Sequence, residues 1–270
     1  MIQKSYTKQF ITLFFVLVIT LLVSISLGSV SIPMDEIIAV LSGNNSSKSS
    51  WSTIILHFRL PKAITAILVG SGLSIAGLLM QTLFKNPLAG PFVLGISSGA
   101  SLGVAILILG AGIFGGFLTA ISYSSWGLAI ASSLGAAMVL LAVLITAHKI
   151  RNTMSILIIG LMFGTVTSAI ISVFTFFSDA EKIQQFVFWG FGSLGNLSWN
   201  EILVFFIIYL ISILTLMNVI KPLNTFLLGE NYAKSLGINI KKNRKIILII
   251  TSLLTGVTTA FAGPIAFIGL

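Results

Sequence analysis

Residues 63–84 read AITAILVGSGLSIAGLLMQTLF. This stretch has no charged side chain, and its length matches the roughly 20 apolar residues that an α-helix needs to cross the hydrocarbon core of a bilayer. The composition of the whole chain agrees, because 56% of its residues are hydrophobic and only 8% are charged, whereas about 25% are charged in a typical soluble domain. The sequence therefore predicts an all-α, polytopic membrane protein.

Seven apolar stretches are long enough to be membrane spans. The third and fourth share one uncharged segment, residues 86–148, which we divide at Gly115-Gly116 through Ser125. The first follows two lysines, as a signal peptide would, but it is longer than a typical signal core and no small-residue cleavage site follows it. The apolar run is still open at Leu270, which indicates a truncated chain. The predicted spans are Phe10–Gly28, Ala63–Phe84, Phe92–Phe114, Trp126–Ala147, Met154–Phe177, Ile202–Ile220 and Ile246–Leu270.

The basic residues predict the orientation of the chain. If the N-terminus is cytoplasmic, eleven of the 15 Lys and Arg residues fall in cytoplasmic segments, and the remaining four are Lys48, Arg59, Lys62 and Lys182. Cytoplasmic loops carry the excess of Lys and Arg in membrane proteins. We therefore predict a multi-pass protein of the cytoplasmic (inner) cell membrane with its N-terminus inside, whose net charge of +9 reflects topology and contact with membrane lipid.

The chain lacks the residues of several functional classes. No Asp, Glu, Lys or Arg lies in the middle of a predicted span, although ion-coupled carriers generally need an ionisable relay there. The sequence has no cysteine and no Gly-rich phosphate loop, and neither His57 nor His148 has a second ligand at metal spacing. We predict no enzymatic activity, no metal site, no cofactor and no nucleic-acid partner. A self-sufficient secondary carrier or channel is the alternative to a partner-driven transporter, and a scaffold is a third possibility.

The segment Arg59–Lys62 is predicted to form a loop at the outer mouth of the second span, where Pro61 suits a first helical turn. Its two cations oppose the positive-inside tendency. They either bind a partner or reach the phosphates of lipid headgroups.

Residues 85–100 connect the second and third spans on the cytoplasmic side. Their prolines and glycines predict an irregular, re-entrant path before the next helix starts. Small residues four apart, such as Gly99 and Gly103, favour close helix packing over a pore-lining role. Hydroxyl side chains in the spans are equally consistent with a polar path and with bonds between helices; they include Ser97, Ser98, Thr165 and Ser168.

The cytoplasmic stretch Lys221–Lys245 contains Leu228, Tyr232 and Leu236, which recur every four residues. This spacing predicts short amphipathic helices ended by Gly237. Such helices either dock into a groove of a soluble partner or lie flat on anionic lipid.

Seven motifs, in order, resemble those of the FecCD-type permeases of binding-protein-dependent ABC importers. They are Arg59–Lys62, Gly77–Gln81, Asn86–Ala89, Leu94–Ala100, Phe188–Gly190 with Gly192–Leu194, Leu228–Glu230 with Ala233 and Leu236-Gly237, and Ala262–Leu270. The resemblance covers essentially the whole chain. It implies the type II ABC importer permease fold, with about seven of ten transmembrane helices present in a single domain, 1–270, that includes a coupling-helix loop at 221–245.

The resemblance also implies a function and partners. The chain would be the permease subunit of an ATP-driven importer that moves iron-siderophore, or haem or cobalamin, by alternating access. It would work with a second permease subunit, two copies of an ABC ATPase that bind ATP-Mg, and an extracytoplasmic substrate-binding protein.

The motifs imply roles for individual residues. Arg59 and Lys62 would dock the binding protein. Lys62, compared with an Arg at that position, keeps the charge but loses the bidentate geometry. The residues that would couple to the ATPase are Leu228, Gly229, Glu230, Ala233, Leu236 and Gly237, and those of the pore or gate are Gln81, Asn86, Pro87, Ser97, Ser98 and Gly99.

Overall fold

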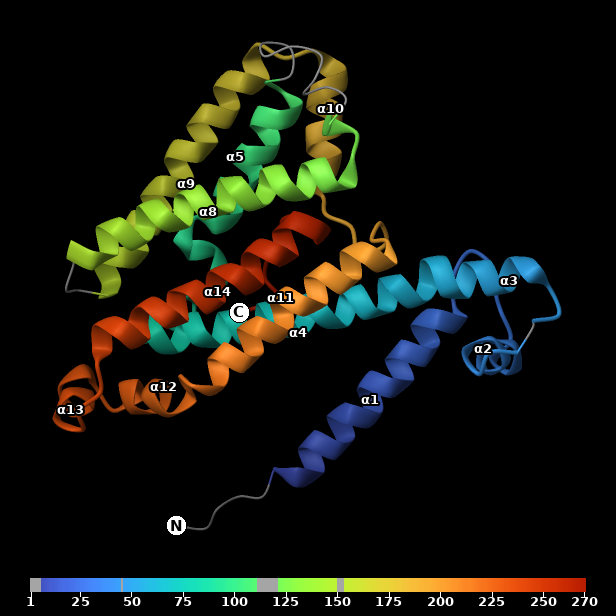
Figure 1. The fold of residues 1–270 in the computed structure, drawn as a ribbon, viewed down its shortest axis with the longest axis horizontal. Coiled ribbons are helices and arrows are strands. Elements are labelled where there is room, and N and C mark those ends of the chain that lie inside the picture. The colour runs from blue at the N-terminus through green and yellow to red at the C-terminus, as the bar shows by residue number, and fades with distance from the viewer. Residues whose placement is uncertain (1–5, 45, 111–120, 150–152) are drawn as a thin grey trace. The chain divides into compact units, whose positions relative to one another are not determined.

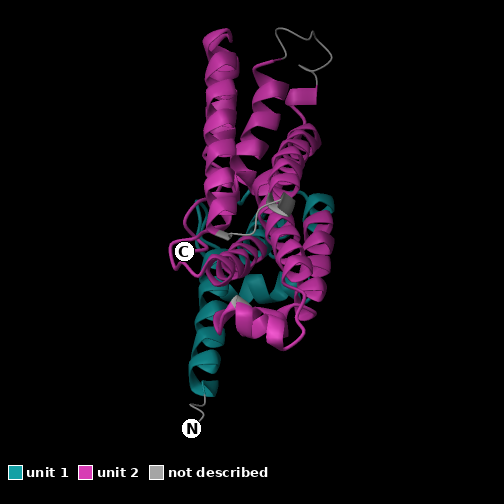
Figure 2. Cartoon of the chain, turned by 90° about the vertical axis from the view of Figure 1, so that its left-hand side faces the viewer, with its two compact units in different colours: residues 1–67, 194–202 teal, residues 68–193, 203–270 magenta. Residues whose placement is uncertain are grey.

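The computed structural model describes residues 6–44, 46–110, 121–149 and 153–270. These residues form helices joined by turns, with no strand in the described ranges (Figure 1). The chain divides into two compact units, residues 1–67 with 194–202 and residues 68–193 with 203–270 (Figure 2).

Six of the seven predicted spans are helices long and apolar enough to cross a membrane, which confirms the polytopic all-α class. They are Thr7–Ser26, Ser49–Phe84, Ser125–Thr146, Met154–Phe176, Trp199–Met217 and Ile240–Ala262. The third predicted span, Phe92–Phe114, contains the end of a short 3₁₀ turn and the 13-residue helix α5 (Ile96–Ile108) within the described residues. Thirteen residues are too few to cross the hydrocarbon core alone. The predicted division at Gly115-Gly116 lies outside the described residues.

The first unit contains α1 (Thr7–Ser26), α2 (Met34–Leu41), α3 (Ser49–Thr53), the π-helical turn η1 (Ile54–Arg59) and the start of α4 (Leu60–Phe84). Its apolar cluster joins Ile25 from α1, Ile37 and Val40 from α2, and Ile55 from η1. This burial fixes α2 and η1 against the end of α1.

The prediction of a loop at Arg59–Lys62 is wrong, because these residues lie inside a continuous helix that starts at Ser49. Pro61 has no backbone N–H, so it can donate no helical hydrogen bond. The chain adapts by widening into a π-helical turn, in which the N–H of Leu60 donates to the carbonyl of Ile55, five residues earlier. Proline here perturbs a helix and does not begin one.

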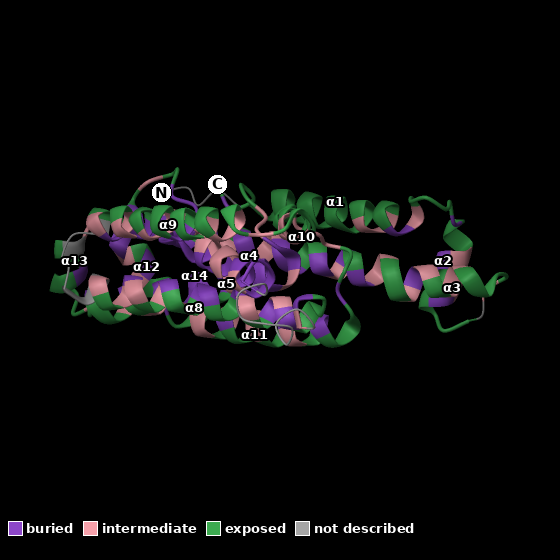
Figure 3. Ribbon diagram, turned by 90° about the horizontal axis from the view of Figure 1, so that it is seen from above, coloured by how far each residue is buried: buried purple, intermediate pink, exposed green. Residues whose placement is uncertain are grey.

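The second unit holds the rest of α4 and the other long helices. They are η2 (Pro91–Leu94, a 3₁₀ turn), α5 (Ile96–Ile108), α8 (Ser125–Lys149), α9 (Thr153–Phe176), α10 (Ala180–Gly190), α11 (Trp199–Met217, whose first turn belongs to the other unit), α12 (Ile220–Leu227), α13 (Glu230–Ser235) and α14 (Ile240–Ala262). Its centre is built by α5, α8 and α14, which contact one another. Figure 3 shows α14 mostly buried and α1 and α9 mostly exposed.

Glycines bring α5 close to α8. A Cβ at Gly99 would lie 2.6 Å from the carbonyl oxygen of Gly135, and a Cβ at Gly103 would overlap the carbonyl of Ala131. The small residues therefore serve helix packing at this pair, as the spacing predicted. Gly112 and Gly116, which have the same four-residue spacing in the sequence, lie outside the described residues.

The last span differs from its predicted bounds, Ile246–Leu270. Helix α14 begins at Ile240, after Asn239 caps it by accepting a hydrogen bond from the N–H of Lys242. The helix ends at Ala262 because Gly263 adopts φ +80° and Pro264 follows it. The apolar residues after Ala262 are not helical, and they end in a turn at residues 268–269.

Candidate functional site

An open groove of about 360 Å³ lies on the second unit, between the η2–α5 turn and α9. No charged side chain lines it, and its walls carry hydroxyl, glycine and apolar groups. Its lining residues are Phe92, Gly95, Ser98, Gly160, Leu161, Gly164, Thr165 and Ser168.

Two glycines allow the η2–α5 turn to form and to lie close to α9. Gly95 has φ +73° between η2 and α5, a conformation that favours glycine. A Cβ at Gly160 on α9 would overlap the carbonyl of Val93. Ser168 and Thr165 donate their hydroxyl hydrogens to Gly164 and Met162 of their own helix, at 3.0 and 2.8 Å. Their oxygen lone pairs remain available as acceptors in the groove.

The structure separates the three residues Ser97, Ser98 and Gly99, for which the resemblance implied one role. Ser98 lines the groove. Ser97 turns toward α14, where its Oγ lies 3.4 Å from Oγ1 of Thr259. Gly99 is buried against α8 at Gly135. Among the three, Ser98 alone belongs to the groove, and Gly99 is a packing residue.

Gln81, Asn86 and Pro87 shape the turn that precedes the groove. Helix α4 ends at Phe84, and Lys85 adopts a positive φ of 49°. The N–H of Asn86 donates to the Gln81 carbonyl at 3.1 Å, and the Asn86 side chain accepts from the N–H of Leu88 at 2.9 Å. Pro87 is exposed in this turn. The irregular path predicted for residues 85–100 is confirmed, but none of these three residues lines the groove.

Motifs that are distant in the chain meet within the second unit. The N–H of Ser193 donates to the Ala262 carbonyl at 2.8 Å, and a Cβ at Gly263 would lie 2.7 Å from the Cα of Gly192. A Cβ at Gly77 would likewise overlap the carbonyl of Gly269. Motifs that are more than 60 residues apart in the chain therefore touch through glycine backbone.

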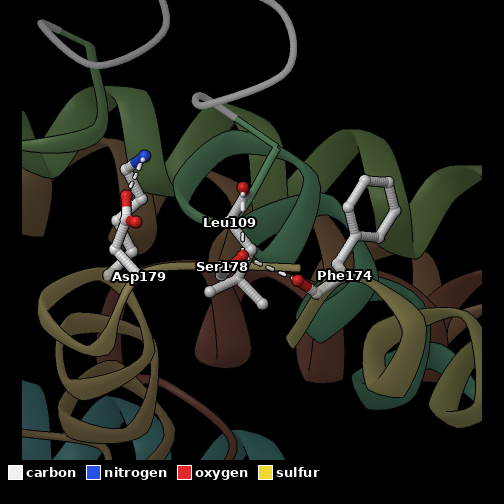
Figure 4. A network of polar contacts seen from close by, with 5 residues as sticks. Leu109, Phe174, Ser178 and Asp179 are labelled. Atoms are coloured by element: carbon white, nitrogen blue, oxygen red, sulfur yellow. Dashed lines mark hydrogen bonds and ion pairs between the residues drawn. The ribbon is translucent and has the colours of Figure 1, made fainter. Parts of the chain in front are cut away.

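A small polar network that sequence reasoning missed links the ends of α5 and α9, next to an ion pair at the start of α10 (Figure 4). Ser178 donates to the carbonyls of Phe174, at 2.6 Å, and Leu109, at 3.3 Å, and so ties the end of α9 to the end of α5. Asp179 precedes α10 and pairs with Lys182 at 3.1 Å. The sequence feature that could have predicted this network is Ser178-Asp179 at a helix boundary, with Lys182 three residues after the Asp.

The two cations expected to dock a partner have different environments. The Arg59 guanidinium donates to the carbonyls of Ile25 (2.6 Å) and Ser26 (2.8 Å), at the end of α1, and to that of Val30. It thereby satisfies carbonyls that have no partner within a helix. Lys62 is exposed, and no ion pair involves it within the described ranges. Of the two, Lys62 is the cation that faces solvent.

The stretch between α11 and α14 forms the predicted short helices, α12 and α13, and Gly237 ends them with φ +78°. Leu223 and Phe226 of α12 and Ala233 of α13 are buried in the core of the unit. Tyr232 is 50% exposed.

Leu228 and Leu236, expected within the helix, flank α13 and are 69% and 58% exposed. Gly229 precedes α13 with φ +116°. The side chain of Glu230 lies outside the described residues. The exposed surface of the segment thus carries large apolar side chains beside polar ones such as Asn231 and Lys234.

The model of the FecCD transport family matches residues 16–270. The vitamin B12 import system permease protein BtuC of Klebsiella pneumoniae is 32% identical over 270 residues, which are 99% of this chain and 76% of that protein. The hemin transport system permease protein HmuU of Yersinia pestis is 32% identical over 250 residues, which are 93% of this chain and 74% of that protein.

The molybdate import system permease protein MolB of Haemophilus influenzae is 30% identical over 273 residues, 98% of this chain and 77% of that protein. Among solved structures, an ABC transporter described as metal-chelate type, in an inward-facing conformation, matches with a TM-score of 0.83 and 28% identity. That match covers 98% of this chain and 79% of the other.

Proposed function

The chain belongs to the FecCD transport family, and we propose that it moves a metal-chelate cargo across the cytoplasmic membrane by alternating access, driven by a partner ATPase. It is a permease subunit of an ABC importer and a multi-pass protein of the cytoplasmic membrane. It is the transport subunit and not the enzyme of the system.

The observation that carries this proposal is the α12–α13 segment. One face of it is anchored in the core by Leu223, Phe226 and Ala233. The other face presents exposed Leu228 and Tyr232. A segment anchored on one side can transmit a movement of a bound partner to the helices that flank it, here α11 and α14.

The proposed assembly contains two copies of an ABC ATPase, a second permease subunit and an extracytoplasmic substrate-binding protein. ATP-Mg would bind to the ATPase copies, and this chain would hold no cofactor. The distribution of Lys and Arg supports an inside N-terminus, which would put α12 and α13 on the ATPase side and Lys62 on the binding-protein side. An exposed cation there suits acidic groups on the lobes of a binding protein.

For the cargo we propose an iron-siderophore first, and haem or cobalamin next. The groove supports a weakly held cargo, because hydroxyls, glycines and apolar groups line it without a charge. Such a surface offers few strong ligands, so selection would occur mainly at the substrate-binding protein.

The test uses the full-length permease, produced together with the ABC ATPase of the same transport system. An affinity tag on the permease captures the ATPase from detergent extracts, and uptake is measured in proteoliposomes. The variant Leu228→Ala with Tyr232→Ala removes exposed apolar contacts, and Tyr123→Ala serves as control because Tyr123 is 68% exposed elsewhere on the same unit.

We expect the double variant to lose most of the captured ATPase and of the ATP-driven uptake, and the control to keep both. Full capture and uptake by the double variant would remove the coupling role. If the unmodified permease captures no ATPase yet transports along an ion gradient, the carrier alternative replaces the proposal.

A further inference from the structure

Helix α2 carries an apolar surface that its own unit covers only in part. Ile37 and Val40 are buried in the cluster of the first unit. Met34, Ile38 and Leu41 are 40%, 60% and 46% exposed. These three positions follow the i, i+4, i+7 spacing and form one stripe beside the buried pair. Part of the apolar surface of α2 is therefore not covered by its own unit.

The polar groups of this region lie away from the stripe. At about 100° per residue, Glu36 lies on the side of α2 opposite the stripe, and Asp35 lies at its flank, roughly 90° from the centre of the stripe. The Glu36 carboxylate accepts hydrogen bonds from the backbone N–H of Ser47, at 3.0 Å, and from the Ser47 hydroxyl. The stripe itself therefore contains no charge and no free hydrogen-bonding group.

The surroundings of α2 are those of a bilayer boundary. Only 6% of the α1 span is buried inside the protein, so most of its apolar surface is available to lipid. Leu27 and Val30, in the connection from α1 to α2, are 64% and 41% exposed and continue that surface. Nearby, the Lys48 ammonium lies 4.8 Å from the centre of the Trp51 ring. Trp is enriched, and Lys extends its charge, at the membrane–water boundary.

We propose that α2 lies in the plane of the bilayer surface, with Met34, Ile38 and Leu41 inserted among the lipid chains on the side where α1 ends. Eight residues are too few to span, but an apolar stripe with acids outside it, at its flank and on the opposite side, suits an interfacial helix. A docked protein suits this surface less well, since the stripe offers it no polar contact. The inference rests on the membrane span α1 and not on the transport role.

The experiment exploits the absence of native cysteine. Ile38→Cys, on the stripe, and Asp35→Cys, its control on the polar face, are labelled with the fluorophore NBD in the full chain in phospholipid nanodiscs. Quenching is measured with aqueous iodide and with phospholipids that carry a doxyl group on the acyl chain. Met34→Cys repeats the measurement at a second stripe position in case Ile38→Cys does not fold, which gel filtration reports.

We expect the label at residue 38 to emit at shorter wavelength, to be quenched several-fold less by iodide than the label at residue 35, and to be quenched by the doxyl lipids. Equal iodide quenching at both positions, without doxyl quenching, would overturn the proposal. Protection from iodide that arises only after the substrate-binding protein is added would also overturn it and assign the stripe to a protein contact.

Discussion

The indole Nε1 of Trp199 donates a hydrogen bond to the carbonyl oxygen of Leu56 at 3.1 Å. In the π-helical register of η1 this carbonyl would accept from the backbone of residue 61. That residue is Pro61, which has no N–H. The first turn of α11 thus supplies the donor that the proline removes from the helix at residues 54–62.

The variant Trp199→Phe should therefore destabilise the first unit. It keeps an aromatic ring but removes the N–H, and a hydrogen bond of this kind contributes about 0.5–1.5 kcal/mol. We expect a fall of a few degrees in the apparent Tm in detergent. Trp126→Phe is the control, because Trp126 makes an edge-to-face ring contact with Phe261 that a phenyl ring preserves.

Pro61→Ala provides a second arm of the same test. It restores an N–H at residue 61, so in the Trp199→Phe background it should recover part of the lost Tm. Equal losses for Trp199→Phe with and without Pro61→Ala would show that the indole acts through packing alone.

The sequence predicts this region less well than it predicts the spans. Apolar length identifies helices reliably, because a helix in lipid must be about as long as the bilayer is thick. It does not reveal the π-helical turn, since Pro61 is compatible both with a helix start and with an interrupted helix. Whether the helix continues through Pro61 depends on the hydrogen bond from Trp199, which is more than 130 residues away in the chain.

The site shows the same limit. Spacing of small residues predicted helix packing at Gly99 and Gly103, and the structure confirms it. The motif around Ser97 could not show which of three neighbours lines a groove, because the choice depends on how α5 lies against α8, α9 and α14. The Ala262–Leu270 run was predicted as helix since its residues are apolar, yet Gly263-Pro264 ends α14.

Arg59 and Lys62 should respond differently to the loss of charge. Arg59→Gln removes a charged donor to three carbonyls, and hydrogen bonds to charged groups contribute about 1.5–3 kcal/mol. We expect a lower Tm. Lys62→Gln should change the stability by less than about 0.5 kcal/mol, as exposed substitutions usually do, but weaken docking of the binding protein. Thermal unfolding and binding-protein titration on the two variants separate stability from docking.

Arg59→Lys is the matched variant for this prediction. It keeps the charge without the planar fork, so it should lose stability while the docking attraction remains. Unchanged Tm in both Arg59 variants would contradict the capping role.

Gly103→Ala should force α5 away from α8. The added Cβ would overlap the carbonyl of Ala131, and overpacking of this kind costs about 1–3 kcal/mol. The control is Gly72→Ala, because the nearest atoms to a Cβ there, on Tyr209, are 3.8 Å away. Alanine is also the better helix former, so the control should be neutral or slightly stabilising in a thermal unfolding assay. Equal Tm values for the two variants would contradict the close contact.

The groove yields the most direct test of the transport path. Ser98→Leu adds volume and removes a hydroxyl in a space of about 360 Å³, so a large cargo should pass more slowly while the partner subunits still assemble. The control Thr20→Leu makes the same kind of change on α1, where Thr20 is exposed and its hydroxyl bonds only to its own helix. Uptake of iron-siderophore is measured in proteoliposomes beside ATP hydrolysis.

We expect Ser98→Leu to lower uptake several-fold per ATP hydrolysed and Thr20→Leu to leave that ratio unchanged. If Ser98→Leu lowered hydrolysis and uptake in equal proportion, Ser98 would act in assembly or coupling. If neither fell, the cargo would pass elsewhere, and the groove between the η2–α5 turn and α9 would be a packing feature of the helices.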